Sequence, residues 1–249
     1  MTDLLALTIP EMLILCGITF VAGVVRGFSG FALSALVMAS AIFILPPVAL
    51  IPICWWLEMS ASIIMARGGW READRGVVMG LVIGSTVGVP FGLALTTSLP
   101  VETSKIVALA LIVAAAVLQL AKIRIPFLAT RAGLYSVGFA AGIATGLASI
   151  GGMIVALYVL SQDAPARKMR AALVMFLFIG ALTSLITYLF FGVMDQTAAL
   201  RGLALIPTTL LGVYVGTKMF TVRLEPYYRP FCLGLLVTLA TVGLIRTAL

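Results

Sequence analysis

Residues 25–34 read Val-Arg-Gly-Phe-Ser-Gly-Phe-Ala-Leu-Ser, and they interrupt a long apolar run with an arginine, two glycines and two serines. The Gly-Phe-Ser-Gly spacing is also that of the nucleophilic serine of some intramembrane proteases, which activate the hydroxyl with a histidine. This chain contains no histidine. Its lysines fall at the ends of apolar segments, where a serine at membrane depth does not easily reach them. We therefore expect no enzyme, and the break needs another explanation.

The composition is that of an integral membrane protein. Of 249 residues, 62% are apolar and 10% charged, whereas soluble domains carry about 25% charged residues. The net charge is +7, but the basic residues lie in short clusters between apolar runs, which argues against a nucleic-acid-binding domain. Cys16, Cys54 and Cys232 are isolated inside apolar runs, so they predict neither a disulfide nor a metal site. We expect no cofactor.

The apolar runs predict an all-α fold. A helix needs about 20 residues to cross a hydrocarbon core about 30 Å thick. Six stretches have that length: 48–66, 76–96, 101–121, 170–191, 198–220 and 229–246. Two further regions, 8–45 and 133–161, are apolar but interrupted near their middles. The pieces of the second region, about 12 to 15 residues each, are short for full crossings. Both regions are therefore predicted to be broken helical hairpins that enter the membrane and return.

Positive charge predicts the orientation, because lysine and arginine gather in cytoplasmic loops. Four basic clusters are separated by loops that are poor in positive charge. The clusters are Arg67, Arg71 and Arg75; Lys122, Arg124 and Arg131; Arg167, Lys168 and Arg170; and Lys218, Arg223 and Arg229. All four fall on one side if each hairpin crosses the membrane an even number of times. Both termini are then predicted on the outer side.

The two halves of the chain resemble each other. Residues 23–27, Gly-Val-Val-Arg-Gly, match residues 142–146, Gly-Ile-Ala-Thr-Gly, and a Gly-x-x-x-Gly pair recurs at 88–92 and 212–216. We expect a first repeat over 1–124 and a second over 125–249, each a hairpin followed by three spans. Because each repeat crosses an odd number of times, the second copy is predicted to be inverted.

Inverted repeats with broken helices are typical of secondary transporters, whose substrates bind where half-helix ends meet. The N-terminus of a helix presents unpaired N–H groups and partial positive charge, which favour an anion. We therefore predict an anion cradle at the two breaks. Its candidate residues are Arg26, Gly27, Ser29 and Gly30 at the first break, and Thr145, Gly146, Ser149, Gly151 and Gly152 at the second. The two serines have an alternative role as packing contacts.

Arg26 and Glu58 are the charges that stand out. A guanidinium at a mid-membrane hairpin tip needs an anion, a carboxylate or water as its partner; alternatively, the hairpin crosses fully and Arg26 reaches the cytoplasmic surface. Glu58 lies near the centre of the 48–66 span. It is a candidate proton carrier, a partner of Arg26 in the empty site, or a structural hydrogen-bond acceptor.

Other polar and aromatic residues are candidates for the pathway. Trp55 and Trp56 lie about one turn from Glu58 and are predicted to line the cavity, with packing or interface anchoring as the alternative. The pairs Ser85-Thr86 and Thr208-Thr209 lie in matching spans of the two halves. They are candidates for lining the pathway or for bonding their own backbone carbonyls.

The two hairpin sequences, Gly-Val-Val-Arg-Gly-Phe-Ser-Gly at 23–30 and Gly-Ile-Ala-Thr-Gly-Leu-Ala-Ser-Ile-Gly-Gly at 142–152, together with residues 164–178 that follow the second, make the chain resemble the TauE/SafE family of membrane exporters. The resemblance implies export of sulfite or of an organosulfonate such as sulfoacetate across a bacterial cytoplasmic membrane. The first hairpin departs from the longer glycine run that members often show, and Arg26 is not a position that the resemblance carries over.

These observations together predict an alternating-access exporter of a small sulfur oxyanion, with proton coupling through Glu58 and a homodimer as further expectations. The lipid bilayer, the anion and protons are the expected partners, and no nucleic acid is. Two alternatives stay open. An exporter of the drug/metabolite superfamily also has inverted repeats but ten full crossings, and a passive anion channel would show uncoupled flux.

Overall fold

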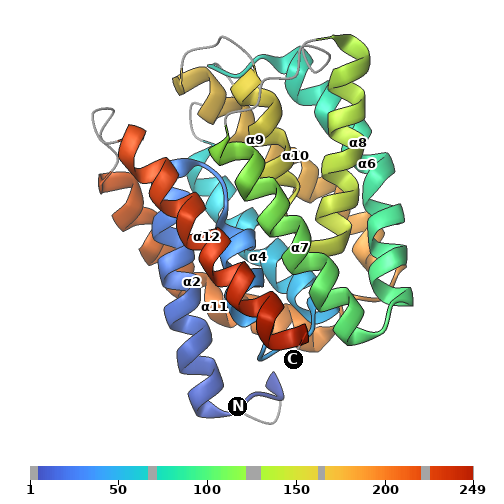
Figure 1. Ribbon diagram of the computed structural model, residues 1–249, viewed down its shortest axis with the longest axis vertical. Helices are drawn as coiled ribbons and strands as arrows, with labels where there is room; N and C mark the ends of the chain where they lie inside the picture. The colour runs from blue at the N-terminus through green and yellow to red at the C-terminus, as the bar shows by residue number, and fades with distance from the viewer. Residues whose placement is uncertain (1–4, 67–71, 122–129, 162–165, 220–224, 249) are drawn as a thin grey trace.

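The computed structural model describes residues 5–66, 72–121, 130–161, 166–219 and 225–248 of the chain, and these residues form a bundle of helices without a strand (Figure 1). The helices of the first half are α2 (Ile9–Ser29), α3 (Leu33–Ala41), α4 (Pro47–Met65), α6 (Arg75–Ser98) and α7 (Val101–Leu120). Those of the second half are α8 (Arg131–Ala148), α9 (Gly151–Ser161), α10 (Ala166–Phe190), α11 (Gln196–Met219) and α12 (Glu225–Ala248). The predicted all-α fold is confirmed.

The helices have the length and polarity of membrane spans. In the described part of the chain, 7 helices are long and apolar enough to cross a bilayer: α2, α4, α6, α7, α10, α11 and α12. Large apolar side chains cover the outside of the bundle; Phe190 is 87% exposed and Ile186 73%. Such a surface is stable in lipid and not in water. The chain is a multi-pass membrane protein.

Polar residues define where several spans begin. Thr8 and Glu11 form a reciprocal capping box at the start of α2, in which the Thr8 N–H donates to Glu11 Oε2 at 2.8 Å. Asp74 accepts from the N–H groups of Gly76 and Val77 at the start of α6. Thr130 does the same for Gly133 at the start of α8. Each side chain satisfies N–H groups that lipid could not.

Both predicted breaks are present, but the legs of each hairpin are unequal. In the first hairpin, α2 has 21 residues and α3 has 9; in the second, α8 has 18 and α9 has 11. The prediction of pieces of about 12 to 15 residues in the second region is therefore wrong, since α8 is longer and α9 is shorter. Residues with positive φ make the turns: Gly30 (82°) and Ala32 (72°) between α2 and α3, and Ser149 (55°) between α8 and α9. At about 1.5 Å per residue, α3 and α9 are too short to span a bilayer, which argues against ten full crossings.

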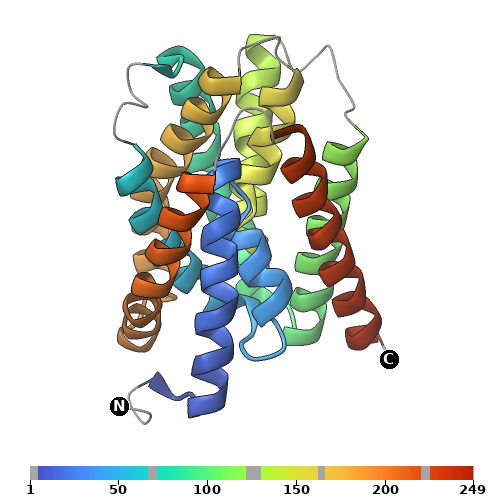
Figure 2. The ribbon, with the colours of Figure 1, turned by 90° about the vertical axis from the view of Figure 1, so that its left-hand side faces the viewer.

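The two hairpins open toward opposite ends of the bundle (Figure 1). Helix α2 runs away from the end that carries both termini and α3 runs back toward it, whereas α8 and α9 enter and return from the other end. The termini lie at the same end in both views (Figures 1 and 2). These directions agree with an inverted repeat, and the relation between the halves stays a prediction.

Glycines let helices of the two halves pack backbone to backbone. Helix α6 packs along α8, and α11 packs along α2. A Cβ added at Gly88 of α6 would collide with the carbonyl oxygen of Phe139, and one at Gly212 of α11 with that of Phe20. Because both obstacles are backbone atoms, no side-chain movement relieves the collision. Each half thus contributes a long helix that packs against the first hairpin leg of the other half, which brings the two breaks into one core.

Candidate functional site

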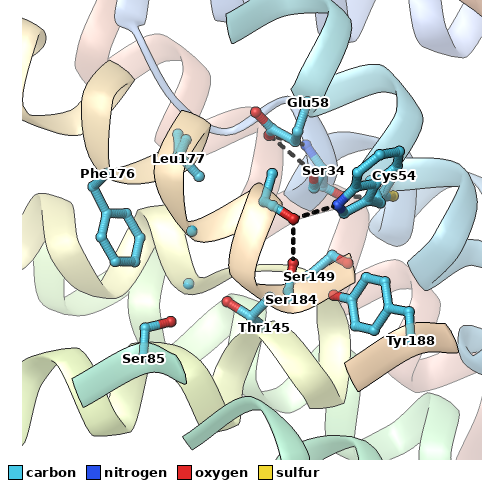
Figure 3. Close-up of a pocket in the computed structure, with 14 residues that line it drawn as sticks. Ser34, Cys54, Glu58, Ser85, Thr145, Ser149, Phe176, Leu177, Ser184 and Tyr188 are labelled. Carbon is cyan, nitrogen blue, oxygen red and sulfur yellow. Dashed lines mark hydrogen bonds between the residues drawn. The ribbon is translucent and has the colours of Figure 1, made fainter. Parts of the chain in front are cut away.

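A cavity of about 40 Å³ lies where α3, α4, α6, α8, α9 and α10 meet (Figure 3). One water needs about 10–15 Å³ of such a cavity, so the space suits a solute of a few heavy atoms. Hydroxyls dominate its polar lining, alongside one carboxylate, one thiol and the edge of an indole. These polar residues are Ser34, Ser85, Thr145, Ser149, Ser184, Tyr188, Glu58, Cys54 and Trp55. The cavity thus presents hydroxyls and one carboxylate within a largely apolar lining.

Glu58 occupies the N-terminus of the short helix α3. Its Oε1 accepts from the Ser34 N–H at 3.3 Å and from the Ser34 hydroxyl at 2.9 Å. Ser34 is the second residue of α3, so its amide is one of those that have no partner inside the helix. The half-helix end that was predicted to hold a substrate anion therefore holds the protein's own carboxylate.

Arg26 lies behind Glu58 and is completely buried. Its Nη2 is 3.3 Å from Glu58 Oε2 and donates to Ser62 Oγ at 2.9 Å, while Nη1 donates to the carbonyl of Gly30. The alternative in which Arg26 reaches the cytoplasmic surface is therefore wrong. The ion pair with Glu58, raised as a possibility from the sequence, is present.

The ion pair leaves hydrogen-bonding capacity unused. Within the described residues, Arg26 Nε and Glu58 Oε2 are buried and have no hydrogen-bond partner. A buried polar atom without a partner costs free energy, so an arrangement in which these atoms gain partners is favoured. Glu58 lines the cavity whereas Arg26 does not, so a solute reaches the carboxylate first.

The second hairpin forms the opposite wall. Thr145, Ser149 and Gly151 line the cavity at the turn between α8 and α9. A Cβ at Gly151 would collide with Thr145 Oγ1 and lie 2.6 Å from the Ala141 carbonyl oxygen, so only glycine fits the start of α9. From α10, Tyr188 also lines the cavity (Figure 3). The Thr145 hydroxyl donates to the Ala141 carbonyl at 2.8 Å, so it would have to exchange that partner to donate to an anion.

The two tryptophans have different positions. Trp55 lines the cavity, and its indole N–H donates to the Ala181 carbonyl of α10 at 2.7 Å, linking α4 to α10. Trp56 packs on Gly202 of α11, where a Cβ would collide with its indole. It does not line this cavity. Its Nε1 is buried without a hydrogen-bond partner among the described residues.

Several other predicted residues lie at helix contacts or in the turns. A Cβ at Gly27 would collide with the Val213 carbonyl oxygen of α11. The Ser29 hydroxyl donates within its own turn, to the carbonyls of Val25 and Phe31, each at 2.7 Å. Gly30 makes the turn that ends α2.

Two glycines of the second hairpin also pack against neighbouring helices and do not line the cavity. Gly146 packs on the backbone of α6, and a Cβ at Gly152 would lie 3.1 Å from the Leu177 side chain. Of the nine residues predicted for the cradle, three line the cavity: Thr145, Ser149 and Gly151. Arg26 does not line it, but it pairs with Glu58, which does.

The sequence analysis did not identify the α10 hydroxyls of Ser184 and Tyr188, or Ser34 and Cys54, as residues that line the cavity. Ser184 and Tyr188 are four residues apart, so they share a helix face. A polar pair with this spacing in an apolar span was a usable signal. Ser85, a candidate from the sequence, does line the cavity, whereas Thr209 bonds its own backbone carbonyl at Leu205 and Thr208 pairs with Thr19.

The arrangement defines a class of protein: a polytopic membrane protein in which two broken hairpins meet α4, α6 and α10 around a small cavity, an architecture typical of transporters. The described residues contain no cluster of three metal-ligating side chains. The sequence model of the family described as "Sulfite exporter TauE/SafE" matches residues 15–242. The chain belongs to this family, which is a family of membrane transporters rather than enzymes. No curated protein and no solved structure gives a significant match.

Proposed function

We propose that the protein is a secondary transporter that exports a small sulfur oxyanion, sulfite or an organosulfonate, by alternating access. The observation that carries the proposal is the buried Arg26–Glu58 pair at the wall of a hydroxyl-lined cavity. An arginine whose charge is neutralised by a movable carboxylate supplies positive charge for an anion when that carboxylate is neutralised or displaced. The family and the volume of the cavity support a small solute.

Alternating access is supported by the way the halves interlock. The cavity lies between the ends of hairpins that open toward opposite ends of the bundle (Figure 1), so a small rotation of the hairpins against α4 and α10 exposes it to either side. The Trp55–Ala181 hydrogen bond joins α4 to α10 beside the cavity, so these two helices stay together while the hairpins move.

Proton coupling is assigned to Glu58. Its Oε2 is buried, lies 3.3 Å from Arg26 Nη2 and has no hydrogen-bond partner among the described residues, so a proton on Oε2 replaces the ion pair by a neutral acid. The carboxylate and the substrate anion compete for the same countercharge. Protonation of Glu58 therefore favours anion binding, and anion binding favours protonation, as linkage requires.

We place the protein in the bacterial cytoplasmic membrane with both termini on the periplasmic side. The starts of α6, α8 and α10, where basic clusters lie in the sequence, are at the end of the bundle opposite the termini (Figure 1). Positive charge there is expected in the cytoplasm. A homodimer is the assembly expected from the sequence, and cross-linking in membranes checks it.

The test is flux of sulfite and short sulfonates into proteoliposomes containing the purified protein, with and without an imposed pH gradient. We expect saturable flux that the gradient accelerates, absent from protein-free liposomes. Glu58→Gln is expected to abolish acceleration by the gradient while sparing anion exchange. The control is Glu102→Gln, which removes an exposed carboxylate paired with Lys105 at 2.9 Å. Unsaturable, gradient-insensitive flux would identify a passive channel instead, and no flux of any sulfur anion would overturn the proposal.

A further inference from the structure

We propose that the transported species is a monoanion that moves together with one proton, so that each cycle is electrically neutral and dianions are excluded. This inference rests on the proposed function and narrows it to a charge class of substrate. Hydrogen sulfite and monosulfonates belong to this class, whereas sulfate, sulfite in its doubly charged form and sulfoacetate do not.

The first step is the charge of the site. Among the described residues that line the cavity, Glu58 is the one with a formal charge at neutral pH, and Arg26 neutralises it from behind. The empty site therefore carries no net charge. When a proton binds Glu58 Oε2 and a monoanion enters, the guanidinium, the neutral acid and the monoanion again sum to zero. A dianion in the same place leaves one uncompensated negative charge at membrane depth, which is costly.

The second step is what surrounds Glu58. Arg26 faces it from α2, Ser34 bonds it from α3, and Cys54 lies one turn earlier on α4. Tyr188 lies across the cavity on α10, while α6 and α8 present only the hydroxyls of Ser85, Thr145 and Ser149. None of these neighbours except Arg26 is a cation.

Arg170, like Arg26, contacts the first hairpin, but it does not alter the net charge of the cavity. It donates to the Gly27 carbonyl at 2.5 Å, does not line the cavity, and is partly exposed. An exposed guanidinium is screened by water and counterions. Its charge is therefore neutralised locally, whereas that of Arg26, which is 0% exposed, depends on Glu58 and on the substrate.

The third step is how the proton and the anion meet. Glu58 Oε1 stays bonded to Ser34 at 2.9 Å, so Oε2 is the oxygen able to take the proton. Protonation of Oε2 frees the Arg26 guanidinium from its ion pair, so an oxyanion that enters the cavity takes over the countercharge. When the anion leaves, the proton leaves Oε2, and the carboxylate pairs again with Arg26. One proton and one negative charge cross in each cycle.

The experiment measures charge and substrate range with the wild-type protein in proteoliposomes. Methanesulfonate is the main probe, because it is always a monoanion, whereas hydrogen sulfite with a proton also yields sulfur dioxide, which crosses lipid unaided. Methanedisulfonate, sulfoacetate and sulfate are the dianions. We expect proton and methanesulfonate fluxes in a ratio of one, no dependence on an imposed membrane potential, and dianion flux lower on the order of a hundredfold, as for one uncompensated charge in the membrane.

Glu58→Gln supplies the second arm. Its empty site carries the charge of Arg26 alone, so its methanesulfonate flux is expected to become proton-independent and sensitive to voltage, while Glu102→Gln behaves as wild type. If this variant does not fold, the wild-type stoichiometry decides by itself. Voltage-driven wild-type flux, or sulfate and sulfoacetate moving as fast as methanesulfonate, would overturn the inference but leave the proposed function standing. Loss of all sulfur-anion flux in the wild type overturns both.

Discussion

Arg26 Nη2 lies 3.3 Å from Glu58 Oε2, and this contact joins the last turn of the first hairpin's long leg to the middle of α4. The two residues are 32 positions apart, and both are buried. Separating a buried ion pair leaves a charge without a partner in a medium that solvates it poorly. The pair is therefore a structural link between the first hairpin and α4.

Removing Arg26 alone is expected to destabilise the protein by about 3–5 kcal/mol, because Glu58 then stays buried without a countercharge. Arg26→Ala combined with Glu58→Gln is expected to recover part of that loss. Thermal stability in detergent, followed as the monodisperse fraction after heating, gives the four corners of a double-mutant cycle. The exposed pair Lys105–Glu102 is the matched control and is expected to couple by about 0.5 kcal/mol or less. Coupling as weak as this at Arg26–Glu58 would contradict the prediction.

Close helix packing at Gly23 gives a second prediction. A Cβ there would collide with the backbone of Thr209 on α11, whereas a Cβ at Gly17, on the same helix, would have nothing within 4 Å. Gly23→Ala is expected to cost about 1–3 kcal/mol, the effect of overpacking. Gly17→Ala is expected to be neutral or stabilising, because alanine favours a helix. The same heating assay compares them, and equal stability of the two variants would show that α2 and α11 do not pack this closely.

The two tryptophans form a matched pair for the third prediction. Trp55→Phe removes an indole N–H that donates to the Ala181 carbonyl, and Trp56→Phe removes one without a partner among the described residues. Since both changes delete similar volume, their difference isolates the hydrogen bond. We expect Trp55→Phe to be less stable than Trp56→Phe by about 1 kcal/mol. A larger loss in Trp56→Phe would mean that its N–H does have a partner.

The reactivity of the Cys54 thiol gives the fourth prediction, because this residue lines the cavity. It lines the cavity and is 0% exposed, whereas Cys16 is only partly buried and Cys232 is buried elsewhere. In a Cys16→Ser/Cys232→Ser background, N-ethylmaleimide is expected to modify Cys54 slowly, and saturating methanesulfonate is expected to slow it several-fold further. Mass spectrometry of the labelled peptide measures the rate. An unchanged rate with methanesulfonate, together with measurable transport of that anion, would place the substrate elsewhere.

Much of the architecture follows from local properties of the chain. Runs of apolar residues are sufficient to predict helices in lipid, because a membrane leaves the backbone no other way to satisfy its polar groups. The breaks at 27–30 and 146–152 were visible as glycine and serine clusters, and the structure has turns at both. The unequal lengths of the hairpin legs were not visible, since the residues on either side of each break are similarly apolar.

The site was only partly predictable, and the glycines show why. Gly27 and Gly146 were predicted to approach an anion, yet both lie against the backbone of a helix from the other half. A glycine signals that something must come close, but not whether that is a ligand or another helix. Ser184 and Tyr188 were missed for a different reason: their spacing places two hydroxyls on one face of α10, but only the packed structure shows that this face lines the cavity.

The sequence by itself determined that this protein is a helical membrane protein of the TauE/SafE family with a broken hairpin in each half. These properties depend on hydrophobicity, glycine placement and charge, which are readable along the chain. Only the tertiary structure decided that Glu58 occupies the N-terminus of α3, that Arg26 pairs with it, and that hydroxyls from α8 and α10 complete the cavity. These relationships join residues from helices that are distant in sequence, and they exist only once the hairpins and the long helices pack together.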